Sequence, residues 1–397
     1  MSDLKIVEVE TIPLSYRYKE EERWKCPGWV SLQRNAMLVR LHTDKGICGI
    51  GEIGEATSIP EGVMRIVEER FKPMLLGEDP TRIEYLWNKM YIRTQHWGMT
   101  ALAVAIISGL EIALWDILGK WLGRPVYDLL GGPCREKIRV YASAGMNQTP
   151  ERLQDEMKRY REEGYTAVKM RIGNRDVRSD IDAVRAAREA LGPAVDLMAD
   201  AGMCYVDSPW DFPTVRRVVR ELEPCRLFWL EEPFTADNID DFALLRRLTD
   251  IPIATGEHVY TKYEFKRYLT ARAVDILQPD ATRCGGILEA KKIAALAEAF
   301  RRRCAPHIFT SGVSLMANLH VIFSTPNMLV MEYDRTPNPL RDELLVEPLV
   351  YRDGYVELPK PVPGLGVELT DEVLKKYSYI PGDPNLKPRF EIDSYIF

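Results

Sequence analysis

The sequence lacks the long apolar runs, the excess of positive charge and the paired cysteines that mark several large classes of protein. No apolar run reaches the roughly 18 residues needed to cross a bilayer, and the N-terminus has no signal-peptide core. Lys and Arg number 53 against 59 Asp and Glu, so the chain lacks the basic surface that nucleic-acid-binding proteins use. We therefore expect a soluble, cytoplasmic protein with neither nucleic acid nor membrane as a partner.

Cysteine and histidine are both scarce. The seven cysteines contain no CxxC pair and are irregularly spaced, which is typical of reduced, buried thiols in a reducing compartment. The five histidines are His42, His96, His258, His307 and His320. Few side chains are therefore available to act as a base near neutral pH.

The first part of the chain predicts a small sheet followed by helices. Residues 4–12 and 35–53 have the alternating pattern of strands, and residues 60–122 have helical periodicity that ends at Gly123-Arg124-Pro125. Residues 16–30 lie between the strands and are charged and aromatic, so we expect an exposed loop there.

From about residue 136, short apolar runs alternate with helical stretches. The runs are Val140–Ala144, Ala167–Arg171, Asp196–Asp200, Phe228–Glu232, Pro252–Glu257, Val274–Asp280, Arg303–His307 and Met328–Asp334. Eight such units favour a parallel (β/α)8 barrel. A doubly wound sheet is the alternative, but no GxGxxG motif follows the first run. We predict an α/β protein with an α+β capping domain (1–132), a barrel domain (133–350) and a C-terminal segment (351–397) that returns to the capping domain.

Polar residues end seven successive predicted strands. They are Lys169 with Arg171, Asp200, Glu231 with Glu232, Glu257 with His258, Asp280, His307 and Glu332. A single carboxylate at such a place is usually a helix cap or an ion-pair partner. Many carboxylates at the mouth of one barrel, however, would repel one another and be costly to desolvate. A hard divalent cation would resolve this conflict, and the all-oxygen set Asp200, Glu231 and Glu257 suits Mg²⁺ better than zinc.

The ordered motifs KxR, D, EEP, GEH, PD, PH and E resemble the mandelate racemase subgroup of the enolase superfamily, and the resemblance covers nearly the whole chain. It implies that Mg²⁺ is held by Asp200, Glu231 and Glu257, with Glu232 as a less favoured substitute for Glu231. It also implies catalytic roles for further strand-end residues: a base dyad of His307 and Asp280, and Glu332 as a hydrogen-bonding partner of the developing enolate.

These implied roles are physically sensible. The α-proton of a carboxylate is too weakly acidic for an unaided base, and a bound Mg²⁺ stabilises the enediolate that its removal creates. Asp280 would hold His307 in one tautomer and raise its basicity. Glu332 would have to be protonated, or share a short hydrogen bond, to help at the enolate oxygen.

One position departs from the family pattern. Mandelate racemase-like members usually carry KxK on the second strand, whereas this sequence has Arg171 at the second Lys position. A guanidinium remains protonated, so it is a poor base but a good clamp for oxygen atoms. A single competent base favours β-elimination of water over racemisation. Lys169 could act as an acid or base, or only contact the substrate carboxylate.

Substrate contacts are implied by the resemblance, in which two loops of the capping domain close over the barrel mouth. The first loop would be residues 16–30, with Arg17, Trp24 and Lys25, and the second would lie near 51–59. His96 and His258 are further candidates for substrate contact. Basic and aromatic side chains in a lid suit a polyhydroxylated acid.

The sequence therefore predicts a Mg²⁺-dependent dehydratase that converts an aldonic or aldaric acid into a 2-keto-3-deoxy acid. A cycloisomerase or racemase acting through the same enediolate is the nearer alternative, and a non-catalytic binding barrel is the more distant one. The resemblance also implies a homo-oligomer, an octamer or a dimer.

Overall fold

A parallel barrel forms the centre of the computed structural model, which describes residues 3–146 and 148–387. Its strands are β6 (Lys137–Ser143), β7 (Ala167–Arg171), β8 (Asp196–Asp200), β9 (Trp229–Glu231), β10 (Ile253–Thr255), β11 (Ile276–Leu277), β12 (Arg303–Cys304) and β13 (Met331–Asp334). Strands β6 to β12 pair in chain order, and β13 pairs with β6. A parallel bridge from Cys304 to Met328 closes the ring, so the predicted barrel is confirmed.

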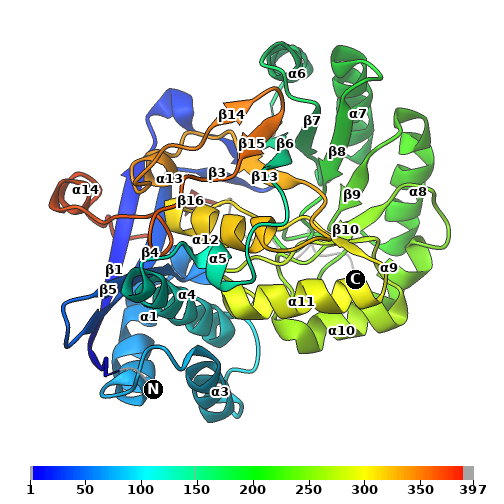
Figure 1. Cartoon of the computed structure of the whole chain (residues 1–397). Coiled ribbons are helices and arrows are strands. Elements are labelled where there is room, and N and C mark those ends of the chain that lie inside the picture. The colour runs from blue at the N-terminus through cyan, green and yellow to red at the C-terminus, as the bar shows by residue number, and fades with distance from the viewer. Residues whose placement is uncertain (1–2, 147, 388–397) are drawn as a thin grey trace.

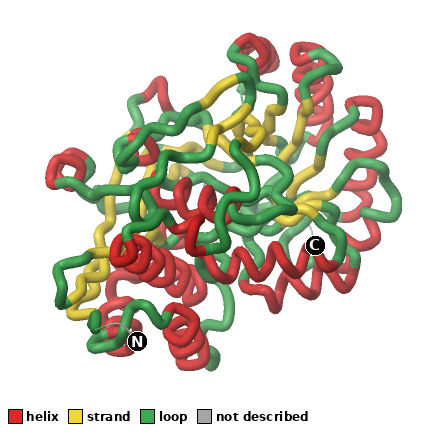
Figure 2. The backbone as a smooth tube through the Cα atoms, in the orientation of Figure 1, coloured by secondary structure: helices red, strands yellow, loops and turns green. Residues whose placement is uncertain are grey.

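Helices connect the strands and lie outside the barrel, as the red coils around the yellow strands in Figure 2 show. They are α6 (Pro150–Glu162), α7 (Val177–Leu191), α8 (Phe212–Leu222), α9 (Ile239–Leu245), α10 (Thr261–Ala271), α11 (Ile287–Ala299) and α12 (Gly312–Phe323). Helix α8 shows why they dock there: Val215, Val218, Val219 and Leu222 recur at helical spacing and are buried.

The barrel interior is filled by one residue from each strand or its immediate flank. This buried cluster consists of Tyr141, Ala167, Met198, Trp229, Ala254, Ile276, Ala305 and Val330. Side chains two residues apart on a strand share a face. The next inward layer, at the carboxyl ends, therefore includes Lys169, Asp200, Glu231, His307 and Glu332, each two positions after a member of the cluster. Strand periodicity thus places these polar groups together, next to the buried cluster that fills the barrel.

The capping domain lies to one side of the barrel (Figure 1). Its antiparallel sheet has the order β1-β4-β5, with β1 at Ile6–Arg17, β4 at Gln33–Thr43 and β5 at Cys48–Glu52. Its helices are α1 (Pro60–Ile66), α2 (Lys72–Leu75), α3 (Ile83–Thr94), α4 (Leu102–Leu122) and α5 (Val126–Leu129). Helix α4 is long and apolar enough to cross a membrane, but 89% of its most apolar window is buried inside the protein, as expected for a core helix.

Residues 16–30 are more ordered than the exposed loop that their composition predicts. Strand β1 extends to Arg17, a short helical turn covers Glu20–Glu22, and β2 (Lys25–Cys26) pairs with β3 (Trp29–Ser31). Backbone hydrogen bonds between β2 and β3 form this hairpin. The polarity of the side chains does not reveal such pairing.

The C-terminal segment contacts both domains. The hairpin of β14 (Tyr351–Arg352) and β15 (Tyr355–Glu357) pairs with β6 of the barrel. Beyond the short helices α13 (Pro339–Asp342) and α14 (Asp371–Lys376), β16 (Asn385–Leu386) pairs with β3 of the capping domain. The last ten residues of the predicted segment, 388–397, lie outside the described residues.

Candidate active site

Three buried carboxylates converge at the carboxyl ends of β8, β9 and β10. Asp200, Glu231 and Glu257 each place one oxygen within 4.8 Å of the others, and all three are at most 2% exposed. Glu257 reaches the group because Gly256 turns the chain at φ 148°, where an added Cβ would lie 2.7 Å from the backbone nitrogen of Gln278. Burial and the charge of Asp200 raise the pKa of the Glu231 carboxyl to about 8, although Lys169 opposes this shift.

The donor set of this cluster fits a hard divalent cation. Within the described part of the chain, Asp200 Oδ1 is buried without a hydrogen-bond partner, and the buried Oδ2 contacts the cations of Arg171 and Lys169. Buried polar atoms are rarely left without a partner, and carboxylate oxygens are the ligands that Mg²⁺ prefers. Asp200, Glu231 and Glu257 therefore have both the chemistry and the proximity to hold such an ion.

Two cations from β7 border the carboxylates. Lys169 Nζ lies 2.8 Å from Glu231 Oε1, 3.0 Å from Glu332 Oε1 and 3.3 Å from Asp200 Oδ2. Arg171 Nη1 lies 2.6 Å from Asp200 Oδ2. Burial lowers the pKa of Lys169, but its carboxylate neighbours, Glu231 first, raise that pKa well above the ordinary value. This arrangement favours the cationic form of Lys169.

The structure brings together His307 and Asp280, which the sequence predicts to be a base dyad. His307 Nδ1 lies 2.8 Å from Asp280 Oδ2, and both residues are buried. The other Asp280 oxygen accepts hydrogen bonds from Thr282 N, Thr282 Oγ1 and Asn318 Nδ2. The carboxylate is thereby held in place, and the outer nitrogen of His307, Nε2, lies 3.5 Å from Glu257.

Glu332 lies between Lys169 and the His307 segment, where its Oε2 accepts a hydrogen bond of 2.8 Å from Ile308 N. Burial raises the pKa of its carboxyl, but Lys169 and His307 outweigh burial and lower that pKa below its usual value. This shift favours the ionised carboxylate. The sequence argument requires Glu332 either to be protonated or to share a short hydrogen bond at the enolate oxygen.

A cavity of about 320 Å³ opens above these groups. Arg171, Glu257 and His307 line it from the barrel, and Trp24 lines it from the capping domain. Trp24 contacts Phe309 of the barrel edge to face, with ring centroids 5.7 Å apart. The indole N–H of Trp24 is buried and has no hydrogen-bond partner among the described residues.

Buried contacts hold the capping domain over the opening of the cavity. Arg34 on β4 pairs with Asp334 of β13 at 3.0 Å, and its guanidinium stacks 4.2 Å from the ring centroid of Phe309. Glu52 at the end of β5 accepts hydrogen bonds from Ser311 Oγ and Ser314 N of the barrel. These contacts join β4 and β5 of the capping domain to β13 and to the segment that follows His307.

Several predicted substrate contacts do not reach the cavity. Arg17, Lys25 and His96 are exposed and are not among the described residues that line it. On a strand, adjacent side chains face opposite sides, so Lys25 points away where Cys26 lines the cavity. His96 instead packs near Trp97 after α3, with ring centroids 6.5 Å apart. His258 pairs with Glu232, both of whose oxygens lie 3.1 Å from its Nδ1.

Other lining residues were not singled out from the sequence. Tyr205 donates a hydrogen bond of 2.6 Å to Glu257 Oε1, and Arg283, 7% exposed, lies 3.4 Å from Glu55 and 3.3 Å from Tyr205. Lys387 of the C-terminal segment also lines the cavity. All three lie outside the strands, where no periodicity indicates which way a side chain points.

Comparison with known proteins agrees with this geometry. Residues 25–131 match the N-terminal domain of mandelate racemase and muconate lactonizing enzyme, and residues 152–373 match the enolase C-terminal domain-like family. The chain belongs to the enolase superfamily. It is an enzyme of the mandelate racemase branch, which excludes the non-catalytic binding barrel.

Two curated relatives span almost all of the chain. Arabinonate dehydratase from Saccharolobus solfataricus is 35% identical over 377 residues, which are 94% of this chain and 99% of the relative. D-galactarolactone cycloisomerase from Agrobacterium fabrum is 36% identical over 361 residues, which are 87% of this chain and 92% of the relative.

Solved structures show the same fold. An enolase superfamily member from Polaromonas sp. JS666 superposes with a TM-score of 0.87 at 34% identity, covering 96% of this chain and 99% of the other. A racemase from Streptomyces coelicolor with bound magnesium superposes with a TM-score of 0.83 at 28% identity, covering 94% and 99%. The mandelate racemase fold of this chain thus has a relative that holds magnesium.

Proposed function

We propose that this enzyme is a Mg²⁺-dependent acid-sugar dehydratase that converts an aldonate or aldarate into a 2-keto-3-deoxy acid. The observation that carries the proposal is that the site has one base. The carboxylate of Asp280 orients this base, His307, and Arg171 occupies the position where a racemase has its second base. The dehydratase relatives support the same reaction class.

The chain's own residues account for the steps. Mg²⁺ held by Asp200, Glu231 and Glu257 would supply positive charge that stabilises the negative charge developing on the substrate carboxylate. His307 Nε2 removes the α-proton, and the C2–H electron pair forms the C2–C3 double bond. The C3–O bond breaks, and the proton held by His307 leaves with the hydroxyl as water. The resulting enol takes up a proton at C3 and loses the proton of its C2 hydroxyl, which gives the 2-keto acid.

Lys169 and Arg171 position the acid end of the substrate. Both remain cationic, because nearby carboxylates outweigh burial and raise the pKa of each well above its usual value. A substrate carboxylate bound beside them gains charge-assisted hydrogen bonds in a site shielded from water. Trp24 covers the other end of the substrate.

A library screen tests the proposal. The Mg²⁺-loaded enzyme is incubated with aldonic and aldaric acids, and 2-keto-3-deoxy products are detected. Formation of a keto product from at least one acid supports dehydration. A cycloisomerase is the second candidate, because a 36% identical relative carries that name. Turnover of sugar lactones without a keto product would favour it and contradict the dehydratase.

Changing Arg171 to Lys tests whether this position serves to bind oxygen atoms or can act as a second base. The shorter, single-headed ammonium loses the 2.6 Å contact with Asp200 and the fork geometry of a guanidinium. We expect the dehydration rate to fall about tenfold or more, with no α-epimer of the substrate formed. Product and epimer are measured together by NMR, and faster turnover or epimer formation in the variant would show that the site works with two bases.

Replacing Asp280 by Asn should move the pH profile. Burial lowers the pKa of His307, but Glu257 and Asp280 outweigh burial and raise that pKa above its ordinary 6.5. The neutral imidazole is the active base, so activity falls as the pH drops below this pKa. Without the Asp280 charge, we expect the acidic limb of kcat/KM to shift to lower pH and the plateau to fall about 100-fold. An unshifted limb would rule out the dyad.

Changing Trp24 to Phe keeps an aromatic ring against Phe309 but removes the unpartnered indole N–H. Loss of one hydrogen bond costs about 1 kcal/mol, so we expect KM to rise about fivefold with kcat nearly unchanged. Lys25→Met is the matched control, because Lys25 adjoins Trp24 but is exposed. Equal changes in steady-state kinetics for the two variants would argue against a substrate contact by Trp24.

A further inference from the structure

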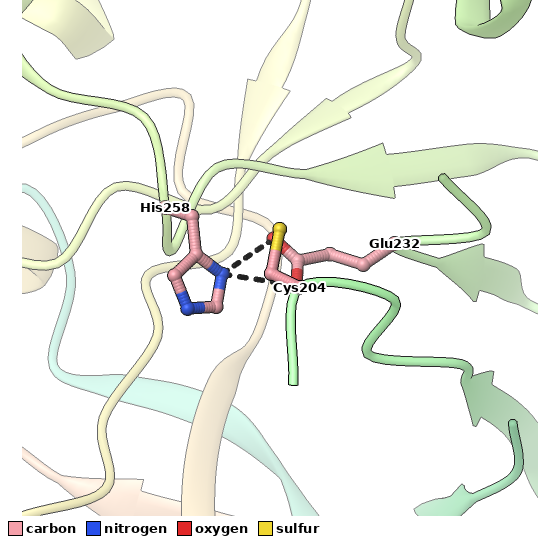
Figure 3. Close-up of side chains that lie close together, drawn as sticks. All are labelled: Cys204, Glu232 and His258. Atoms are coloured by element: carbon pink, nitrogen blue, oxygen red, sulfur yellow. Dashed lines mark hydrogen bonds and ion pairs between the residues drawn. The ribbon is translucent and has the colours of Figure 1, made fainter. Parts of the chain in front are cut away.

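A second group of metal-ligating side chains lies next to the carboxylate cluster. Cys204, Glu232 and His258 each offer one ligand atom, and these atoms lie within 4.8 Å of one another. Figure 3 shows the three side chains converging, with His258 Nδ1 directed at the Glu232 carboxylate. The dehydration steps use none of these residues.

The chain positions the two groups with the same three strands. Glu232 directly follows Glu231 after β9, His258 directly follows Glu257 after β10, and Cys204 comes four residues after Asp200 in the loop beyond β8. Every ligand of the carboxylate cluster thus has a counterpart in the second group. The second group differs in chemistry, because it combines sulfur, nitrogen and oxygen.

The spacing of the ligand atoms suits a tetrahedral ion. His258 Nδ1 lies 3.1 Å from each oxygen of Glu232. Bonds of about 2.0–2.3 Å to zinc place neighbouring tetrahedral ligand atoms about 3.3–3.6 Å apart. Cys204 Sγ lies within 4.8 Å of the other two ligand atoms, and Cys204 also lines the cavity, which gives ions a route to the group.

The backbone of Glu232 is unusual as well. Its φ is 43°, a left-handed conformation that is unfavourable for a residue with a Cβ and that often marks functional sites. Its peptide N–H bonds to Ala254 O, and its carbonyl accepts from Met203 N. Hydrogen bonds on both sides hold this conformation, so the carboxylate of a buried residue is kept in place beside His258.

We propose that Cys204, Glu232 and His258 form a second metal site, selective for a thiolate-binding divalent ion such as Zn²⁺. Sulfur and imidazole ligands favour Zn²⁺ over Mg²⁺, whereas the neighbouring all-oxygen cluster favours Mg²⁺. Binding displaces the protons of the thiol and of the His258–Glu232 pair, so each Zn²⁺ bound releases protons to solvent.

The test measures metal content with Mg²⁺ in large excess. We expect wild-type enzyme, dialysed against micromolar Zn²⁺, to retain one zinc per chain by elemental analysis. Cobalt(II) at the same site should give a thiolate-to-metal charge-transfer absorption band. Cys204→Ser should remove the band and weaken zinc binding at least tenfold while Mg²⁺-dependent thermal stabilisation persists.

Cys48→Ser is the matched control. Cys48 Sγ also lies 3.2 Å from a histidine nitrogen, His42 Nδ1, but Glu10 is at the opposite ring nitrogen, 3.2 Å from Nε2. One ion cannot bind all three, so this variant should retain the zinc.

Three results would overturn the proposal: no retained zinc in the wild type, loss of zinc in Cys48→Ser, or an unchanged cobalt band in Cys204→Ser. An unchanged cobalt band in Cys204→Ser would place the ion in another site, such as the carboxylate cluster. If Cys204→Ser does not fold, His258→Gln provides the same comparison with the thiol intact.

Discussion

Replacing His307 by Asn will abolish turnover and leave Mg²⁺ binding intact. His307 is the sole neutral-pH base among the described residues that line the cavity, and Asp280 fixes its ring from the far side at 2.8 Å. The asparagine amide fills much of the same space but cannot accept the α-proton. General-base catalysis contributes about 10²–10⁴ in rate, so we expect a loss of about a thousandfold in kcat.

The measurement pairs steady-state kinetics with Mg²⁺ titration followed by thermal shift. His42→Asn is the control, because His42 lies in the capping sheet beside Glu10 and Cys48, away from the cavity. Activity near that of the wild type in His307→Asn would exclude His307 as the base. A loss of Mg²⁺ binding would instead show that the substitution disturbs the carboxylate cluster.

Removing Mg²⁺ with a chelator will abolish activity, and adding it back will restore both activity and stability. Without a bound metal ion, Lys169 and Arg171 offset only part of the charge of the three-carboxylate cluster. Asp200 is the largest charge acting against ionisation of Glu231. Bound at about 100 times its Kd, an ion stabilises the fold by about 2.7 kcal/mol. We therefore expect Mg²⁺ to raise the melting temperature of the wild type by a few degrees.

Glu231→Gln should remove this Mg²⁺-dependent rise together with the activity. Burial and Asp200 raise the pKa of the Glu231 carboxyl to about 8, which favours its neutral form, so we expect the neutral amide to leave the metal-free stability nearly unchanged. Asp180→Asn is the matched control, since Asp180 is also buried but holds the backbone of Gly173 and Asn174. A Mg²⁺-induced rise that survives in Glu231→Gln would place the ion elsewhere.

The barrel and the centre of its site could be predicted from sequence because strand geometry repeats. A run such as Ala167–Arg171 has an apolar residue facing inward at Ala167, and two positions later Lys169 occupies the same face. The resemblance favoured Glu231 as the ligand, with Glu232 as a less favoured substitute. The structure separates them, since Glu231 joins Asp200 and Glu257 while Glu232 pairs with His258.

The walls of the cavity were harder to predict, because they come from segments without a periodic pattern. Trp24 lines the cavity and Lys25 does not, a distinction set by the β2–β3 pairing that composition alone missed. Tyr205 and Arg283 extend from loops, and Lys387 arrives from the far end of the chain through β16. Long-range pairing of this kind depends on tertiary packing, which local sequence does not encode.

The central claim is that one base removes the α-proton and that the 3-hydroxyl then leaves. Its most direct test follows an acid-sugar substrate by NMR in D₂O with the Mg²⁺-loaded enzyme. We predict loss of the C2 proton together with a 2-keto-3-deoxy product that carries deuterium at C3. Exchange at C2 with the hydroxyl retained, whether or not the configuration inverts, would contradict the account and assign the site to racemisation or cycloisomerisation.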